Sequence, residues 1–484
     1  MFIYEQRLIN WCYRRDNAMS GIERRRFLKS MAVGGMGMYA ATHPALGASF
    51  LASASGAQRP NIVLIMADDL GYETIGAYGS ASYRTPHIDE LAATGVKFEH
   101  CHSQPLCTPS RVKIMTGKFN VNNYVKFKYL DPNEKTFGNM LKAAGYKTCI
   151  TGKWQLSSDD DRLEMPGHFG FDDWCLWHFG GADKGNRYYD PKLWQNGVLR
   201  TDTQGKFGPD VCTDFACDFI DRNKAEPFFV YYPMILTHDP FVWAPDATAE
   251  TKFGSLVEHM DKKVGQITAK LDSLGLRENT LIIFTGDNGT LTSVESLMTD
   301  GSTVSGTKGL LGHDSTRVPM VANWRGTIPA GGVSNDMVDF ADMFPTFAEM
   351  AGQTIGDDID GVSLVSVLTG NGAKRRDWVF IDFKSKTASE FDWMIATREW
   401  GVFKDGSMEQ MVSNPSESRE AARARLSTIA LNIMAGNEPV RTMGPAPSQR
   451  GRTQNNRSGL FDGLGRVHPN RKRGTFARRL LWER

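Results

Sequence analysis

The chain has 484 residues, and its 56 basic and 55 acidic side chains nearly cancel, which removes any overall electrostatic argument for nucleic-acid binding. A hydrophobic content of 41% and a charged content of 23% are ordinary for a soluble globular protein of one large or two medium domains. The seven cysteines have irregular spacing, which argues against a disulfide framework or a zinc motif, and no apolar run is long and clean enough to be an obvious membrane span.

The first 58 residues are expected to be an export signal and a linker. The hexapeptide RRRFLK at residues 24–29 fits the twin-arginine pattern, and a weakly apolar stretch rich in Gly, Ala and Met follows it. We therefore expect the twin-arginine machinery to export the folded protein to the periplasm or the extracellular space, and the processed protein not to span a membrane. Met19 is a candidate for the true start, because the residues before it look out of place upstream of such a signal.

Four apolar runs predict strands that are buried on both faces, as in a parallel sheet. They lie at residues 61–66, 147–151, 228–232 and 281–284. Helices are predicted between them, one opening at Thr85 and Pro86 and one with apolar residues at helical spacing over 257–274. This alternation indicates an α/β domain over residues 59–370, with a large, mostly parallel or mixed sheet covered by helices.

Polar side chains follow each of the four predicted strands at its carboxyl end. In chain order they are Asp68 and Asp69, then Lys153, then His238, then Asp287 and Asn288. Ligands bind at this edge of open α/β sheets, so these residues are expected to be neighbours in space. The carboxylate and amide oxygens suit calcium or magnesium better than zinc. Read singly, the Asp-Asp and Asp-Asn-Gly sequences are also ordinary turn formers.

The stretch PLCTPSR at residues 105–111 places a cysteine in a turn that leads into a predicted helix over 110–116, capped near Ser110. Cys107 could be an apolar filler, half of a disulfide with Cys101, a metal ligand or a nucleophile. A position at or just before the helix amino terminus favours developing negative charge, and Arg111 lies about one turn further on. Among the four alternatives, these features favour the interpretation of Cys107 as a nucleophile.

The pattern of predicted elements changes after about residue 370. Residues 378–383 and 393–404 are predicted strands of a small antiparallel element, and a helix over 416–434 is expected to complete a subdomain at 371–436. Residues 437–484 are rich in Arg, Gly, Pro and Asn, and they are expected to be a basic, largely disordered tail.

The motifs carry a family resemblance. RPNIVLIMADDLG at 59–71 and CTPSR at 107–111 resemble the two signatures of type I, formylglycine-dependent sulfatases, which belong to the alkaline phosphatase superfamily. The similarity continues through TGKW at 151–154, THDP at 237–240, GDNG at 286–289, KG at 308–309 and RVP at 317–319. The resemblance implies an alkaline-phosphatase-like fold and hydrolysis of sulfate esters, most simply those of sulfated carbohydrates.

The resemblance also implies the chemistry of the site. A maturation enzyme oxidises Cys107 to formylglycine, whose hydrate attacks sulfur through one hydroxyl and releases sulfate when the second hydroxyl loses its proton. The implied metal ligands are Asp68, Asp69, Cys107, Asp287 and Asn288, with Ca²⁺ favoured over Mg²⁺. Arg111 and Lys153 are implied to hold the formylglycine, and His238 and Lys308 to contact the sulfate. The ordinary alternatives are that His238 is a structural histidine of the core and that Lys308 is a surface lysine.

Gln155 departs from the family pattern, which has His two residues after the lysine of GKW. Glutamine can form hydrogen bonds but cannot act as a base. It could orient the hydrate while another group takes the proton, His178 or His313 could substitute, or turnover could be slow. A phosphonate or phosphate ester hydrolase and a weakly active sulfoglycan-binding homologue are the rival functions. The aromatic side chains over 174–189 suit either stacking on sugars or core packing.

Overall fold

The structure is a computed structural model that describes residues 59–157, 162–179, 184–370, 376–384 and 388–436, together with the backbone of Arg478–Arg479. The export signal and nearly all of the basic tail expected from the sequence lie outside these residues. The chain from Arg59 onward forms one compact unit, so the α/β domain and the small subdomain share a single body.

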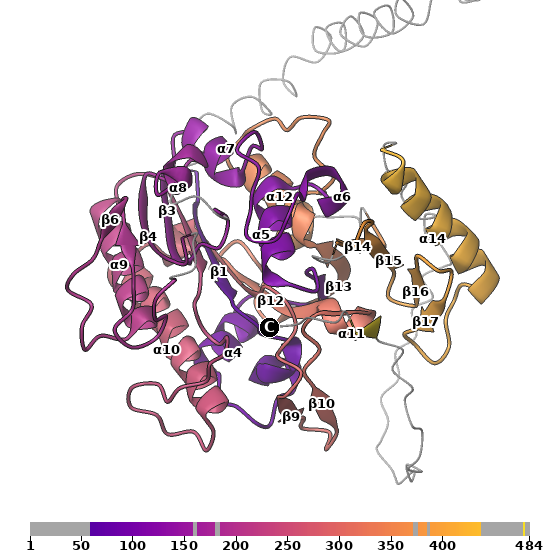
Figure 1. Ribbon diagram of the computed structural model, residues 1–484, viewed down its shortest axis with the longest axis horizontal. Coiled ribbons are helices and arrows are strands. Elements are labelled where there is room, and N and C mark those ends of the chain that lie inside the picture. The colour runs from indigo at the N-terminus through magenta and orange to yellow at the C-terminus, as the bar shows by residue number, and fades with distance from the viewer. Residues whose placement is uncertain are drawn as a thin grey trace, which may run out of the picture. The chain divides into compact units, whose positions relative to one another are not determined.

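A mixed sheet dominates the described residues (Figure 1). Its ten strands have the order β13-β2-β12-β8-β1-β7-β3-β4-β5-β6. They are β1 (Asn61–Ala67), β2 (Val96–His102), β3 (Lys147–Lys153), β4 (Asp173–Trp177), β5 (Trp194–Gln195), β6 (Val198–Leu199), β7 (Phe228–Pro233), β8 (Thr280–Gly286), β12 (Arg317–Asn323) and β13 (Gly332–Asp339). Neighbouring strands from β8 to β4 pair in parallel, whereas β12 and β5 run antiparallel to their neighbours. The predicted mixed α/β sheet is therefore confirmed.

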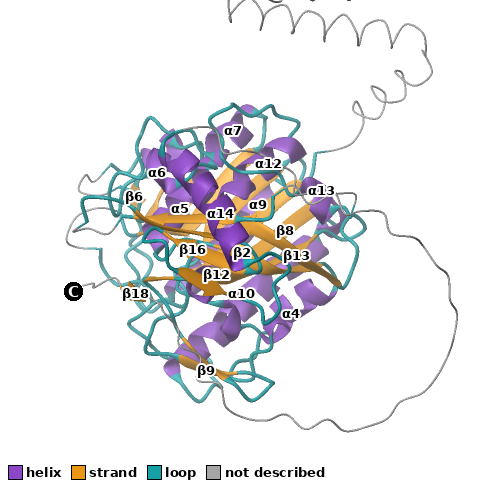
Figure 2. Ribbon diagram, turned by 90° about the vertical axis from the view of Figure 1, so that its right-hand side faces the viewer, coloured by secondary structure: helices purple, strands orange, loops and turns teal. Residues whose placement is uncertain are grey.

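Helices cover both faces of this sheet, and Figure 2 shows the strands between α7 and α12 on one side and α4 and α10 on the other. The α-helices are α4 (Pro86–Ala93), α5 (Cys107–Thr116), α6 (Asn120–Asn123), α7 (Phe137–Ala143), α8 (Met165–His168), α9 (Gly208–Arg222), α10 (Lys252–Ser273), α11 (His313–Thr316), α12 (Met343–Met350), α13 (Val365–Leu368) and α14 (Arg419–Met434). Short 3₁₀ turns are η1 (Tyr72–Thr74), η2 (Gly76–Tyr78), η3 (Arg277–Asn279) and η4 (Phe340–Asp342). Among these helices, none has the length and apolar character needed to cross a lipid bilayer.

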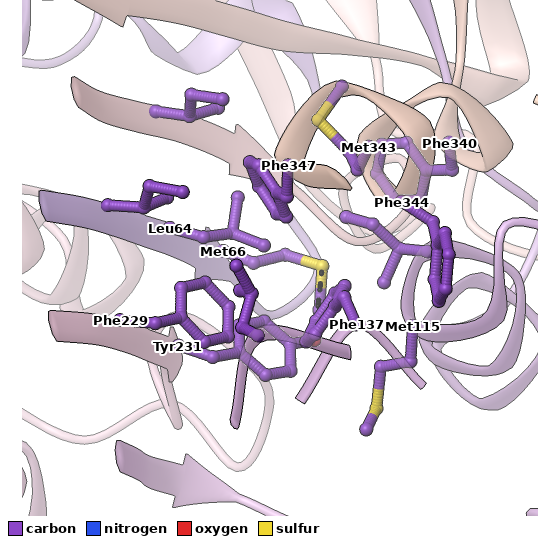
Figure 3. Packing of buried hydrophobic residues seen from close by; sticks show 14 of the residues in the cluster. Leu64, Met66, Met115, Phe137, Phe229, Tyr231, Phe340, Met343, Phe344 and Phe347 are labelled. Carbon is purple, nitrogen blue, oxygen red and sulfur yellow. Dashed lines mark hydrogen bonds between the residues drawn. The ribbon is translucent and has the colours of Figure 1, made fainter. Parts of the chain in front are cut away.

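The alternation of side chains along β1 divides the core into two layers. Ile62, Leu64 and Met66 pack into one cluster with α5, α7 and α12, while the intervening residues pack into another with α4, α9 and α10. Figure 3 shows Phe137 and Phe347 from these helices beside the sheet residues Leu64 and Met66. Every residue of β1 is buried, and its side chains are apolar from Ile62 to the end of the strand.

A second sheet of four antiparallel strands follows the large one, as the sequence predicts. It comprises β14 (Val379–Phe383), β15 (Asp392–Ala396), β16 (Trp400–Phe403) and β17 (Met408–Gln410). One face packs against α14 through Leu426 and Ala430, and the other packs against Met337 of β13 and Leu311. The region predicted as one strand over 393–404 is thus two strands joined by a turn.

Two shorter strand pairings and one helix boundary complete the description. β9 (Glu295–Leu297) and β10 (Thr303–Ser305) form a hairpin in a region left unassigned by the sequence, and β11 (Leu310–Leu311) pairs with β18 (Arg478–Arg479). The predicted cap near Ser110 is wrong, because α5 begins at Cys107 after Leu106. Cys107 is therefore the first residue of the helix, which confirms its predicted position at the amino terminus.

A buried ion pair ties α5 to the small sheet. The Lys113 Nζ atom lies 2.9 Å from the Asp339 carboxylate and donates to the Phe380 carbonyl at 2.5 Å. Both side chains are 1% exposed. The Asp339 carboxylate also accepts from the backbone N–H groups of Ala341 and Phe380, so it is fully engaged with groups from three elements.

Replacing Lys113 by Met is expected to lower the free energy of unfolding by about 3–5 kcal/mol, because it leaves the Asp339 charge buried without its partner. Chemical denaturation followed by fluorescence measures the change. Lys142→Met is the matched control, since Lys142 also pairs with a carboxylate at 2.7 Å but is 49% exposed. It should cost about 1 kcal/mol or less. Equal losses in the two variants would contradict the role given to the buried pair.

Candidate active site

Strands β1 and β8 are parallel neighbours, so the residues that follow them meet at one edge of the sheet. The Asp69 backbone N–H donates to Asp287 Oδ1 at 3.0 Å, and Asn288 Nδ2 donates to Asp69 Oδ1 at 2.8 Å. All four predicted oxygen ligands, including Asp68, are at most 1% exposed. The expectation that the two acidic pairs are neighbours is therefore met by the geometry.

Helix α5 brings Cys107 to the same edge. Asp68, Cys107 and Asp287 each offer one ligand atom, and these atoms lie within 4.8 Å of one another. All ten residues of the helix are buried, and Cys107 itself is 2% exposed. Burial raises the pKa of the Cys107 thiol, so the unmodified side chain is protonated near neutral pH and donates to Gln155 Oε1 at 2.9 Å. Cys107 and Cys101 are both free thiols, so the alternative of a disulfide between them is wrong.

Two buried cations neutralise these carboxylates. Lys153, the last residue of β3, donates to both Asp68 oxygens at 2.8 Å. Arg111 lies one turn after Cys107 and donates to Asp287 Oδ2 at 2.8 Å and to the Lys153 carbonyl at 3.1 Å. Burial opposes ionisation of Asp68, but Lys153, His238 and Arg111 together hold its pKa well below the usual range. Arg111 thus fixes the carboxylates around residue 107, and its hydrogen bonds go to Asp287 and to the Lys153 carbonyl rather than to the thiol.

The oxygen ligands fit a hard divalent cation. Burial and the like charge of Asp68 raise the pKa of Asp287 to about 7. The neighbouring cations therefore do not fully compensate the negative charge of this carboxylate. The Asn288 Oδ1 atom is buried and has no hydrogen-bond partner among the described residues, while its Nδ2 atom is engaged. A bound cation would satisfy both groups, and it would supply positive charge for the nucleophile and for the ester oxygens. Asp68, Asp69, Asp287 and Asn288 are the residues that would hold it.

His238 and Lys308 lie together on the other side of Asp69. The Lys308 Nζ atom lies 2.5 Å from Asp69 Oδ2 and 3.1 Å from His238 Nε2, and His238 Nε2 is 3.5 Å from the same carboxylate oxygen. The loop after β7 is fixed to the loop after β1, because the Thr237 N–H donates to the Asp68 carbonyl at 2.7 Å. The side chain of His238 remains 18% exposed, so the pair is positioned to meet a ligand entering from solvent.

Arg187 belongs to this site and was missed by the sequence analysis. Its Nη1 atom lies 3.9 Å from Asp68 Oδ2 and has no hydrogen-bond partner among the described residues. The guanidinium stacks over the Trp177 ring at 4.3 Å from its centroid. The side chain is only 8% exposed, which is unusual for an unpaired arginine nitrogen and suits an anion-binding role. Arg187 comes from a loop without periodic pattern, and its neighbouring aromatic residues were the only signal.

Gln155 lies in contact with residue 107, and its backbone is held in the left-handed region at φ 56°. The Gln155 N–H donates to the His178 carbonyl at 3.1 Å, and His178 also has a positive φ of 69°. Such backbone outliers concentrate at functional sites. Burial and nearby cations, led by Lys153, lower the pKa of His178 to about 2, so its imidazole is neutral. Of the two histidines considered as substitutes, His178 adjoins Gln155, whereas His313 packs against His102.

Replacing Gln155 by His is expected to preserve hydrolysis of an aryl sulfate, because histidine tolerates a positive φ and can keep a hydrogen bond to residue 107. Gln155→Leu removes that bond and should lower kcat/KM by about tenfold. Steady-state kinetics of the matured enzyme measure both. A wild type that fails on every sulfate ester while Gln155→His hydrolyses them would show that glutamine does not support turnover.

A nucleophile position beside three carboxylates, with cations converging on them, defines a hydrolase for esters of strong oxyanions. The sequence profile described as Sulfatase matches residues 60–353, and that of N-sulphoglucosamine sulphohydrolase, C-terminal, matches residues 307–404. The chain therefore belongs to the sulfatase family, and it is a sulfuric ester hydrolase.

Individual relatives agree with this assignment. The chain is 32% identical over 371 residues to N-acetylgalactosamine-6-sulfatase of Canis lupus familiaris, which covers 67% of this chain and 69% of the relative. It is 31% identical over 421 residues to steryl-sulfatase of Rattus norvegicus, with coverage of 67% and 72%. The solved structure of Ps i-CgsB in complex with k-i-k-neocarrahexaose is similar with a TM-score of 0.67, 25% identity, and coverage of 79% of this chain and 94% of that one.

Proposed function

We propose that this sulfatase removes sulfate from sulfated carbohydrates, that a maturation enzyme converts Cys107 to formylglycine, and that the cation is Ca²⁺. The observation that carries the proposal is the convergence of Asp68, Cys107 and Asp287 within 4.8 Å, beside two buried cations. Formylglycine would supply a hydrated aldehyde as the nucleophile, a role for which the buried, protonated thiol is poorly suited.

The chain's own residues support hydrolysis of a sulfate ester to an alcohol and inorganic sulfate. Arg111 and Lys153 hold in place the carboxylates that surround residue 107. Lys308 and His238 face a ligand as a cation and an imidazole 3.1 Å apart, so one can bind sulfate oxygen while the other donates a proton to the departing alcohol oxygen. Gln155 orients the side chain at position 107. Arg187 adds a further positive charge for the anionic ester.

Two exposed aromatic side chains support the carbohydrate part of the proposal. Tyr189 and Trp243 are 43% and 46% exposed, and the Tyr189 hydroxyl donates to the Trp243 carbonyl at 2.9 Å. Their neighbour Tyr188 donates to the His238 carbonyl at 2.6 Å, which links this aromatic pair to the sulfate-facing loop. Of the other aromatics in this region, Trp177, Phe179 and Tyr188 are buried and Trp174 is partly buried. Exposed rings beside a site can stack on the apolar faces of sugars.

The test compares Trp243→Ala with the wild type on a sulfated oligosaccharide, an aryl sulfate and an aryl phosphate. We expect KM for the oligosaccharide to rise about three- to tenfold with kcat unchanged, and the aryl sulfate kinetics to stay constant. A higher kcat/KM for the phosphate than for the sulfate would favour the phosphate or phosphonate ester hydrolase. Binding of the oligosaccharide without turnover, with position 107 converted, would favour a sulfoglycan-binding protein.

Ca²⁺ and export are separate parts of the proposal. The three carboxylates and the amide oxygen suit the flexible coordination of Ca²⁺ better than the strict octahedron of Mg²⁺. Activity after chelation should return with Ca²⁺ at lower concentration than with Mg²⁺. The twin-arginine pattern at residues 24–29 supports export, and replacing Arg24, Arg25 and Arg26 by Lys should retain the protein in the cytoplasmic fraction.

A further inference from the structure

Three histidines form a cluster that the sulfatase site does not use. His100 and His102 lie two residues apart on β2, so both point to the same face of the sheet. His313 opens α11 and packs its ring against both, with centroid separations of 6.0 Å from His100 and 4.7 Å from His102. One ring nitrogen of each histidine lies within 4.8 Å of those of the other two.

The hydrogen bonds of the cluster leave nitrogen lone pairs free on its inner side. The Thr316 hydroxyl donates to the Gly312 carbonyl at 3.1 Å, so it accepts from His102 Nδ1 at 3.2 Å, which leaves His102 Nε2 without a proton. His313 Nδ1 lies 3.3 Å from Asp314 Oδ1, and donation to that carboxylate leaves its Nε2 unprotonated in the same way.

Three ring nitrogens have no hydrogen-bond partner among the described residues. They are His100 Nδ1, His102 Nε2 and His313 Nε2. His102 is 1% exposed and His313 is 4% exposed, so two of these polar atoms are deeply buried. An unpartnered buried nitrogen carries a desolvation cost that a ligand would remove, and three in one cluster point to a common ligand.

The charge state of the cluster suits a metal ion and not an anion. Burial, together with His313, lowers the pKa of His100 to about 4, and burial holds the pKa of His102 well below the usual range. Both imidazoles are therefore neutral at pH 7 and available as ligands without losing a proton. Apart from Asp314, two neighbouring carboxylates are engaged elsewhere: Glu99 pairs with Arg317 at 2.9 Å, and Glu409 accepts from the His313 backbone at 3.3 Å.

We propose that His100, His102 and His313 form a Zn²⁺ site, distinct from the oxygen-ligand site at the catalytic centre. Three imidazole nitrogens with one open position are an established zinc arrangement, and imidazole selects transition metals over calcium or magnesium. Thr316 and Asp314 provide the outer hydrogen bonds that orient ligating histidines. His100 is partly exposed and gives the ion its path from solvent.

The site joins the two segments that carry catalytic side chains. His102 precedes Cys107 by five residues, and His313 follows Lys308 by five. The segments are already linked by the Ser103 N–H to the Thr316 carbonyl at 2.9 Å and by the Gly309 N–H to the Pro105 carbonyl at 2.9 Å. A zinc ion would add a third link, so its main effect is on the stability of this region.

The test is zinc uptake by the purified full-length chain, dialysed against ZnCl₂ with excess Ca²⁺ present to fill the oxygen-ligand site. Elemental analysis should give one more zinc per chain for the wild type than for His313→Gln, whose Kd for zinc should be weaker by at least about 100-fold. Asp314→Asn should weaken it by about 10- to 100-fold. Saturating zinc should raise Tm by about 4 °C or more in the wild type.

His168→Gln is the matched control, because His168 is a helical histidine outside the cluster, bonded to the Pro132 carbonyl at 2.7 Å. It should take up zinc as the wild type does. If His313→Gln fails to fold, the visible spectrum of Co²⁺ bound to the wild type is the deciding measurement. A four-coordinate Co²⁺ with three imidazole ligands gives an intense visible band, whereas Co²⁺ at the oxygen-ligand site gives a weak one. Equal zinc uptake by wild type and His313→Gln, or only the weak cobalt band, would overturn the proposal.

Discussion

Replacing Cys107 by Ala is expected to lower kcat/KM for an aryl sulfate by about 10⁴-fold or more, because it removes the proposed nucleophile from a site whose other parts remain. Cys107 is the first residue of α5 and donates to Gln155, and neither the helix nor its core contacts depend on the sulfur. The measurement is steady-state kinetics on enzyme produced with the maturation enzyme, with mass spectrometry of the peptide that contains residue 107.

Cys217→Ala is the matched control, since Cys217 is a buried free cysteine on α9. Its kcat/KM should equal that of the wild type. Cys107→Ser gives a sharper outcome: the hydroxyl can accept sulfate but lacks a second hydroxyl to expel it. We expect release of one equivalent of alcohol, then arrest with sulfate attached to the protein. Sustained turnover by Cys107→Ala would show that residue 107 is not the nucleophile.

Replacing Asp287 by Asn should lower kcat by about 10³-fold and abolish retention of a divalent cation, because it removes one of three carboxylates from the proposed cation site. Asp287 also accepts from Arg111 at 2.8 Å and from the Asp69 N–H at 3.0 Å, so its loss disturbs residues on both sides. Kinetics and elemental analysis after gel filtration measure the two effects together.

The control for this variant is Asp261→Asn. Asp261 is 1% exposed on α10, where it accepts from the backbone N–H groups of His87 and Ile88 at the start of α4. The amide offers an oxygen to only one of these two N–H groups, so the variant should lose some stability. Activity and cation content should be retained, because the bonds of Asp261 connect α10 to α4 and not to the cation site. A full cation content in Asp287→Asn, with activity lost, would restrict Asp287 to orienting Arg111.

The polar edge of the sheet could be predicted because β1, β7 and β8 are mostly apolar and polar side chains follow them. β1 is the clearest case: seven buried residues lead directly into Asp68 and Asp69. Parallel pairing then brings such ends together whatever the order of the strands, so the site did not require knowledge that β7 lies between β1 and β3. The type of fold and the four proposed oxygen ligands follow from that local pattern.

Other parts of the site depend on tertiary contacts that leave no local pattern. Arg187 follows no strand, and only the packing of its guanidinium on Trp177 beside Asp68 gives it meaning. Lys113 has the sequence context of an exposed helical lysine, yet its partner Asp339 is 226 residues away. The histidine cluster combines β2 with a helical turn more than 200 residues later, and the spacing along the chain gives no sign of it.

The burial of α5 limits when the proposed conversion of Cys107 to formylglycine can take place. A modifying enzyme must bind the peptide around the cysteine, but in the folded chain every residue from Cys107 to Thr116 is buried. The thiol must therefore be oxidised on the nascent polypeptide, before the core closes. Since the proposed twin-arginine route carries folded proteins, this conversion would be finished in the cytoplasm, and a chain that folds with an unmodified thiol would be exported without its nucleophile.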